Sequence, residues 1–496
     1  MQTSNGEETD YRNPAGQLNY IANYSKALPH NALGEVTPAA YRSLVRALDS
    51  GDPASFEQIS LGLPATGLNL TSPQAGLAFD LEGPDAHSLT LPPAPRIDGP
   101  ENSAEMGELY WMALMRDIPF ADYATHATAA LAVTDMNAFT DFRGPKFGGI
   151  VTADTLFRGF TPGDLAGPYV SQFLLIGNAD AALGLAPEDG FVRYGTLRID
   201  QRQRTAQPGI DYLTVFADWL AVQRGQDRRG LDAIEAQPRF IRNLRDLATY
   251  VHFDALYEAY LNACLVLLSI PAPLDPGNPY VDSRTQDGFA TFGGPHILSL
   301  VCEVATRALK VVWWQKWGVH RRLRPEAFGG RLEVHRNRVP GRYPMINDEI
   351  LNSQAIAAIE AANGTALLPM AFPEGSPTHP AYGAGHATVA GACVTILKAW
   401  FDESFELPNP VVANATGDTL LTTGGPPLTV GGELDKVAAN VAIGRNAGGV
   451  HWRSDYTESV KLGEAIAIGI LEEQKLCYNE PHHLSLTRFD GARISI

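Results

Sequence analysis

Apolar residues recur at helical spacing over most of the chain after residue 105, and this periodicity limits the fold more than any other feature of the sequence. In the first such segment, residues 105–118, the side chains of Met106, Leu109 and Met112 repeat every three residues. We therefore expect an all-α fold of helical bundles, with two cores that each resemble a four-helix bundle. The further helical segments are residues 211–225, 241–269, 293–317, 350–363, 386–402, 433–444 and 455–477.

Segments rich in Pro, Gly and Ser separate these helices. Residues 62–103 predict a long arm over the surface. Residues 404–433, with several glycines and prolines beside short β-prone runs, predict a small β-hairpin or an ordered loop. We accordingly expect an N-terminal arm of loops and short helices over residues 1–104 and an all-α domain over residues 105–496, with its chemical motifs within residues 313–455.

The formal net charge of -17 argues against nucleic acid as a partner, because phosphate backbones select basic surfaces. With 45% hydrophobic residues, the chain can bury a sizeable core. In so acidic a protein, a local cluster of Lys and Arg is informative, because it opposes the overall field.

Other bulk features exclude some classes. The four cysteines form no CxxC pair, so we expect buried free thiols and no cysteine-based zinc site or dense disulfide framework. No apolar run approaches about 18 residues, so no membrane span is expected. Residues 1–10 lack the basic and apolar regions of a secretory signal, and the sequence leaves the compartment open.

The first of three chemical motifs contains Lys316, Arg324 and Pro325, at the end of a predicted helix. Pro325 disfavours helical geometry at Arg324, so the helix should end at or before Arg324. Lys316 and Arg324 would then approach one anion from two directions, as a point charge and a planar fork. The alternative is that these cations only complement the helix macrodipole.

The second motif runs from His379 to His386, where Ala384 and Gly385 precede a strongly helical run. A glycine at a helix start lets an anion approach exposed backbone N–H groups, so Gly385 is a candidate donor. The positive end of the helix disfavours a charged imidazole and suits His386 as a neutral base. A tight turn without chemistry is the alternative.

The third motif places Arg445 and His451 on either side of a Gly448–Gly449 break. A lone histidine in such a position is more often a core residue than a ligand. The joint pattern of the three motifs is what favours a site.

Together, Lys316…Arg324-Pro325, Gly385-His386 and Arg445…His451 resemble the signature of vanadium haloperoxidases and the related type 2 phosphatidic-acid and bacterial acid phosphatases. The resemblance covers residues 105–475 and makes residues 105–496 a haloperoxidase-like catalytic domain. The stretches that resemble algal and cyanobacterial bromoperoxidases are Glu108–Met112, Phe292–Ile297 and His451–Asp455.

The resemblance implies a vanadate cofactor, with hydrogen peroxide as oxidant and a halide as substrate. His451 would ligate vanadium, while Lys316, Arg324, Arg445 and the backbone N–H of Gly385 would bind the vanadate oxygens. Lys316 would also donate to the peroxide. The product would be a hypohalous-acid equivalent that halogenates a small organic acceptor.

His386 would take a proton as peroxide binds, as the resemblance implies. His379 and Trp313 would form the halide pocket, and they favour bromide and iodide over chloride. The alternatives are a loop histidine and a core tryptophan.

Three weaker assignments surround this set. Asp254 is a candidate carboxylate partner of Arg324, or else a surface acid, and Asp455 is expected to orient a neighbouring side chain. Ala384 stands where family members normally have serine, whose hydroxyl would bind a vanadate oxygen. Its absence should weaken vanadate binding by about 0.5–1.5 kcal/mol.

Two other functions stay open, an acid phosphatase that forms a phosphohistidine at His451 and a non-catalytic oxyanion-binding protein. We also expect a homo-oligomer, as in related bromoperoxidases. Calcium near residues 282–287 follows only by analogy with relatives, because the spacing of oxygen ligands there is unconvincing.

Overall fold

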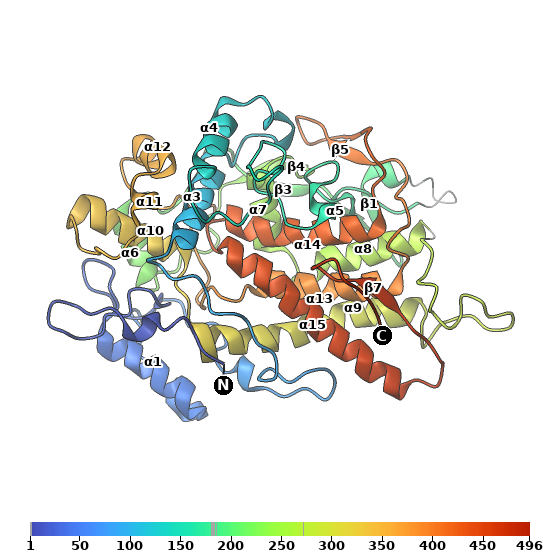
Figure 1. Ribbon diagram of the computed structural model, residues 1–496, viewed down its shortest axis with the longest axis horizontal. Helices are drawn as coiled ribbons and strands as arrows, with labels where there is room; N and C mark the ends of the chain where they lie inside the picture. The colour runs from blue at the N-terminus through green and yellow to red at the C-terminus, as the bar shows by residue number, and fades with distance from the viewer. Residues whose placement is uncertain (1, 180–183, 185, 271) are drawn as a thin grey trace.

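The computed structural model describes residues 2–179, 184, 186–270 and 272–496, and its regular structure is predominantly helical (Figure 1), so the predicted all-α class is confirmed. The α-helices are α1 (Pro38–Ser50), α2 (Pro53–Phe56), α3 (Pro100–Leu114), α4 (Ala127–Met136), α5 (Pro162–Leu165), α6 (Phe216–Gln223), α7 (Leu244–Phe253), α8 (Glu258–Ser269), α9 (Gly294–Trp313), α10 (Pro325–Glu333), α11 (Asp348–Leu351), α12 (Gln354–Asn363), α13 (Gly385–Trp400), α14 (Val430–Ala447) and α15 (Arg453–Cys477). The 3-10 turns are η1 (Glu7–Thr9), η2 (Ala75–Leu77), η3 (Phe120–Asp122), η4 (Gln172–Leu174) and η6 (Pro187–Asp189), and the π-helical turns are η7 (Trp314–His320) and η8 (Val334–Arg338).

The described strands form two-stranded antiparallel ribbons at the edges of the helical body. The β5–β6 hairpin falls within residues 404–433, as predicted, whereas the other ribbons were not expected from the sequence. The strands are β1 (Phe191–Tyr194) with β2 (Leu197–Asp200), β3 (Gln203–Ala206) with β4 (Ile234–Arg239), β5 (Val411–Ala413) with β6 (Leu420–Thr422), and β7 (Ser485–Thr487) with β8 (Arg493–Ser495).

Helix α13 lies at the centre of the core and packs against α9, α14 and α15. Its residues are buried around nearly the whole circumference, as expected for an apolar helix enclosed by others. A side chain at Gly391 would lie 2.1 Å from the carbonyl oxygen of Val460, and one at Gly463 would lie 2.0 Å from that of Thr388. These two glycines therefore allow the close approach of α13 and α15.

The N-terminal arm carries a small core of its own. The rings of Tyr20 and Tyr41 stack with centroids 4.0 Å apart, and Tyr24 packs edge-on against Trp317 of η7. The arm is therefore anchored to the π-helical turn that follows α9.

Several local expectations need correction. The segment 241–269 is two helices, α7 and α8, with a bend of 98° between them, and α1, α4 and α10 were missed. Among the described residues no single helix is long and apolar enough to cross a membrane, although the bent pair α7–α8 reaches that length and composition. The cysteines are free, but Cys302 is partly exposed and Cys477 exposed, so only Cys264 and Cys393 fit the predicted burial.

Candidate active site

The helical run that contains Lys316 ends four residues later, and this places the first motif. The π-helical turn η7 ends at His320, and Arg321 adopts a left-handed conformation with φ 43°. Arg324 is extended and Pro325 begins α10, which confirms the predicted helix end. Lys316 and Arg324 therefore leave two different elements and meet in the interior.

Backbone carbonyls hold the Lys316 ammonium in place. Its Nζ donates to the carbonyl oxygens of Pro380 at 2.8 Å and Ala381 at 3.1 Å, and lies 5.5 Å from the ring centroid of Trp313. This side chain thus joins the first motif to the second.

Arg324 connects all three motifs. Its Nη2 donates to His379 Nδ1 at 2.9 Å, and its Nη1 lies 3.0 Å from His451 Nε2. The guanidinium is therefore hydrogen-bonded to both imidazole rings. Nη1 also donates to the carbonyl oxygen of Val450 at 2.7 Å. The guanidinium is therefore flanked by the two imidazoles that the sequence assigned to the halide pocket and to vanadium.

Arg445 reaches the same region from the last turn of α14. Its Nη1 donates to the carbonyl oxygen of Val251 at 2.8 Å. Its Nε is buried without a hydrogen-bond partner among the described residues, and its guanidinium lies 5.5 Å from the Phe372 ring centroid.

Lys316, Arg324 and Arg445 are only 0%, 1% and 6% exposed, yet none of them forms an ion pair with a carboxylate of the described residues. Burial lowers the pKa of Lys316 well below its usual value and lowers those of Arg324 and Arg445 to about 10. Three buried, unpaired cations are costly, and this cost is offset when an anion binds among them.

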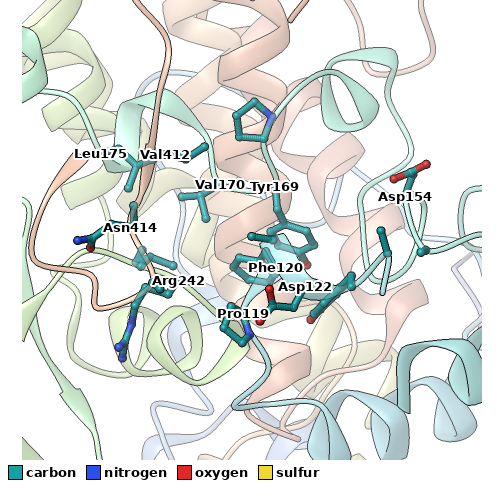
Figure 2. Close-up of a pocket in the computed structure, with 18 of the residues that line it drawn as sticks. Pro119, Phe120, Asp122, Asp154, Tyr169, Val170, Leu175, Arg242, Val412 and Asn414 are labelled. Atoms are coloured by element: carbon teal, nitrogen blue, oxygen red, sulfur yellow. The ribbon is translucent and has the colours of Figure 1, made fainter. Parts of the chain in front are cut away.

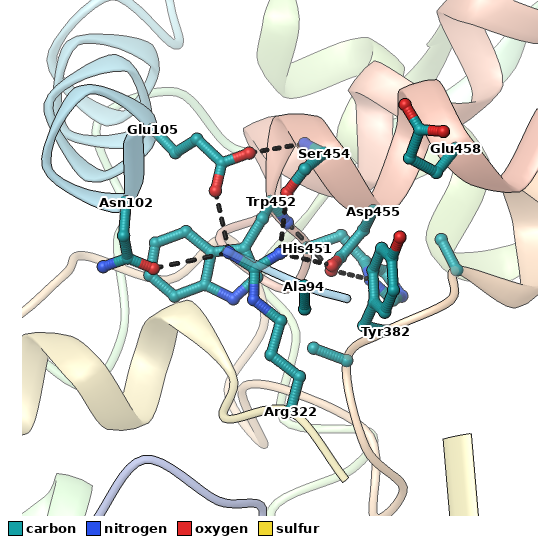
Figure 3. A network of polar contacts seen from close by, with 12 residues as sticks. Ala94, Asn102, Glu105, Arg322, Tyr382, His451, Trp452, Ser454, Asp455 and Glu458 are labelled. Atoms are coloured by element: carbon teal, nitrogen blue, oxygen red, sulfur yellow. Dashed lines mark hydrogen bonds and ion pairs between the residues drawn. The ribbon is translucent and has the colours of Figure 1, made fainter. Parts of the chain in front are cut away.

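Arg322 differs from these three cations because its charge is paired with carboxylates (Figure 3). This buried guanidinium donates to Glu105 at 2.8 Å and to Asp455 at 2.9 Å, and although burial opposes it, these carboxylates raise the pKa of Arg322 above its usual value. Two arginines two residues apart thus have opposite environments, and among the described residues Arg324 has no carboxylate partner.

Asp455 also fixes the ring of His451. Its Oδ2 lies 2.7 Å from His451 Nδ1 and accepts from the backbone N–H of Trp452 at 3.0 Å (Figure 3). Nδ1 therefore carries the ring proton, and Nε2 presents its lone pair toward the cations. Burial and the neighbouring Arg324 lower the pKa of His451 well below its usual value, so the ring is neutral.

The partner predicted for Asp254 is wrong. This carboxylate, directly after α7, lies 3.1 Å from His386 Nε2 and has no contact with Arg324, because α7 ends beside the start of α13. Burial lowers the pKa of His386 despite the opposing effect of Asp254. His386 is therefore neutral, with its ring held by a carboxylate.

The start of α13 places Ala384 and Gly385 at the same end as His386. Ala384 is the N-cap residue, offers no side-chain cap, and donates its N–H to Ser459 Oγ at 2.8 Å. A side chain at Gly385 would press on the Trp313 ring at 3.2 Å. The N–H of Gly385, in the first helical turn, has no intrahelical acceptor.

His379 and Trp313 lie together, with ring centroids 4.8 Å apart. The Trp313 Nε1 donates to the carbonyl oxygen of Thr71 at 3.1 Å, so the N-terminal arm holds this ring. Burial and the nearby Lys316 lower the pKa of His379 well below its usual value.

A cleft of about 320 Å³ leads to this cluster, and His386, Arg445 and Asp254 line it. Leu68 and Thr71 of the arm and His252 of α7 also line the cleft. Sequence reasoning missed these three residues, because the arm carries no chemical motif. It also missed Arg322, which pairs with Glu105. The signal was that Glu105 and Glu108 lie three residues apart in the apolar part of a helix, where buried carboxylates need partners; Glu108 pairs with Arg453.

A second cavity, of about 330 Å³, contains none of the predicted site residues (Figure 2). The stacked rings of Phe120 and Tyr169 line it, with centroids 3.8 Å apart. The loop suggested for calcium is also separate, since Asp282 and Asp287 are exposed and belong to no converging group of metal-ligating side chains among the described residues.

The comparisons of this chain with known proteins agree with one another. The family described as "VCPO second helical-bundle domain" matches residues 351–480. The chain is 43% identical to the vanadium-dependent bromoperoxidase of Corallina officinalis over 99% of this chain and 94% of that protein. It is 34% identical to the vanadium-dependent bromoperoxidase of Ascophyllum nodosum, over 97% and 87%. A solved homohexameric structure, the second vanadate-dependent bromoperoxidase of Ascophyllum nodosum, superposes with a TM-score of 0.88 at 30% identity, over 100% of this chain and 86% of that chain.

Proposed function

This chain belongs to the vanadium-dependent bromoperoxidases, and on that premise we propose how its own residues serve the reaction. It is a vanadate-dependent haloperoxidase that oxidises a halide, bromide or iodide, with hydrogen peroxide. When bound, vanadate supplies a Lewis-acid centre that activates peroxide toward a halide. The residues proposed to hold vanadate are Lys316, Arg324, Gly385, Arg445 and His451.

The observation that carries this proposal is the group of three buried cations without carboxylate partners among the described residues, together with the unpartnered Nε of Arg445. An oxyanion matches these donors in charge and in hydrogen-bonding geometry. His451 Nε2 faces this group of cations and offers the single nitrogen lone pair that a metal ligand requires.

His386 is proposed to move the proton. Because its Nε2 is hydrogen-bonded to Asp254, Nδ1 is the ring nitrogen available to accept a proton from incoming peroxide. The negative charge of Asp254 then stabilises the imidazolium that forms, and the proton can return to the product.

Trp313 and His379 are proposed to form the halide pocket beside Lys316, whose ammonium attracts a halide and donates to the peroxide. An organic acceptor would enter through the cleft, where Leu68, Leu256 and Phe372 supply apolar surface. The acceptor class proposed is therefore a small, partly apolar molecule.

The division into an arm, residues 1–104, and a catalytic domain, residues 105–496, also remains a proposal, in which the arm lines the cleft and holds Trp313. We further propose a homo-oligomer, by likeness to the hexameric relative.

The test is bromination of monochlorodimedone by the vanadate-loaded protein with peroxide and bromide, measured beside hydrolysis of p-nitrophenyl phosphate. We expect bromination that requires vanadate and little hydrolysis. Hydrolysis without bromination would favour the phosphatase alternative, which the relatives do not support, and anion binding without either activity would favour a binding protein.

A further inference from the structure

Three metal-ligating side chains that the mechanism does not use converge beside the active-site cleft, and two of them, His252 and Glu374, line it. His252 comes from α7, Asp232 from the segment before β4, and Glu374 from the segment that precedes α13. Their ligand atoms all lie within 4.8 Å of one another, although up to 142 positions separate them in the chain (374 minus 232). Tertiary packing alone brings them together.

The distances within this group suit a shared metal ion better than hydrogen bonds. His252 Nε2 lies 3.5 Å from Asp232 Oδ1 and 3.5 Å from Glu374 Oε1. A hydrogen bond between these atoms would be shorter, at about 2.7–3.2 Å. Two ligand atoms that each lie about 2.0–2.1 Å from a tetrahedral zinc ion are about 3.4 Å apart, close to the two separations from His252.

Each of the three side chains is largely buried, and one of them, Glu374, has an unsatisfied oxygen. The side chains of His252, Asp232 and Glu374 are 14%, 9% and 13% exposed. Glu374 Oε2 is buried without a hydrogen-bond partner among the described residues. Two carboxylates desolvated so close together repel each other, and a cation between them would relieve that repulsion.

His252 is suited to be a ligand. Its ring stacks on Phe372 with centroids 3.9 Å apart and an interplanar angle of 9°, which fixes the orientation of Nε2. Burial and the nearby Arg445 lower the pKa of His252 to about 4, so at neutral pH the ring keeps a lone pair for a metal.

We propose that Asp232, His252 and Glu374 bind a divalent transition-metal ion, best matched by zinc, with one coordination position open to the cleft. One imidazole and two carboxylates with a free position is a ligand set that zinc accepts. His252 and Glu374 line the same cleft as His386 and Arg445, so the ion would add positive charge along the path of an entering halide. Arg229 and Arg445 also line this cleft, and their charges temper the affinity.

The experiment uses the vanadate-loaded protein, so that the vanadate site is occupied. Wild type and His252→Ala are equilibrated with Zn²⁺, dialysed, and analysed for zinc and vanadium. We expect wild type to retain one more zinc per chain than His252→Ala, with unchanged vanadium. His483→Ala is the matched control, since His483 is an exposed histidine outside the group and its loss should leave the zinc content at the wild-type value.

Glu374→Gln provides a second variant with little change in shape, and thermal denaturation provides a second measurement. Zn²⁺ should raise the melting temperature of wild type and of His483→Ala, and should do so less for Glu374→Gln. The proposal is overturned if wild type retains no zinc, if His252→Ala retains as much as wild type, or if Zn²⁺ leaves the wild-type melting temperature unchanged.

Discussion

Asp455→Asn should test whether the orientation of His451, the proposed vanadium ligand, affects vanadate affinity separately from the stability of the fold. Asp455 accepts from Arg322 with Oδ1 and from His451 and Trp452 with Oδ2. An asparagine at this place has one oxygen and one NH₂ group, so in either orientation a donor faces a donor. If the NH₂ group faces His451, the ring proton must move to Nε2, which removes the lone pair that vanadium needs.

The effects of Asp455→Asn on vanadate affinity and on stability can both be estimated. Loss of the carboxylate that orients a metal-ligating histidine lowers metal affinity about 10- to 100-fold. Breaking the buried contact with Arg322 costs about 3 kcal/mol, at the low end of the range for buried pairs because Glu105 remains as a partner. For a chain of 496 residues, this lowers the melting temperature by about 3 °C, at about 1 °C per kcal/mol.

Glu105→Gln is the matched control. Glu105 also pairs with Arg322 and accepts from the N–H of Ser454, but it does not contact His451 (Figure 3). Vanadate titration of the two apoenzymes, with thermal denaturation of each, should show a similar loss of stability in both variants and a loss of vanadate affinity only in Asp455→Asn. Equal loss of affinity in both, or none in Asp455→Asn, would refute the reasoning.

Three further predictions concern other groups. Ala384→Ser should tighten vanadate binding about 2- to 13-fold, from one added hydrogen bond of about 0.5–1.5 kcal/mol, in a titration of the apoenzyme; an unchanged dissociation constant would contradict this role. Asp254→Asn should lower turnover at least about 10-fold while changing vanadate affinity little, because it removes the charge that supports protonated His386; steady-state kinetics beside the titration distinguish the two effects. His30, hydrogen-bonded to Ser25 and Leu28, has a pKa lowered to about 3 by burial, so its contribution to stability is present above about pH 6.5 and is lost as the pH falls toward 3. His30→Asn should reduce the pH dependence of the free energy of unfolding, measured with urea, by up to about 1.4 kcal/mol per pH unit across that window. An unchanged pH dependence would exclude His30 as the cause.

Many of the helices could be predicted from the sequence, because helical periodicity is a local property. The segments predicted over 386–402, 433–444 and 455–477 are the helices α13, α14 and α15. The end of the helical run before Arg324 was also predictable, since Pro325 restricts the backbone of its neighbour. The bend between α7 and α8 could not be predicted, because no Pro or Gly marks a break between these two segments.

The sequence by itself determined which residue types form the candidate site, through the spacing of Lys316, Arg324, Gly385, Arg445 and His451. Only the tertiary structure decided which charges are paired. Within the part of the chain that the structure describes, Arg322 pairs with two carboxylates and Arg324 with none, and Asp254 contacts His386 instead of Arg324.

The same holds for the three side chains beside the cleft, Asp232, His252 and Glu374, which come from three distant segments. The physical reason is that helix formation depends on neighbours a few residues away, whereas the partner of a buried charge depends on how helices far apart in the chain pack together.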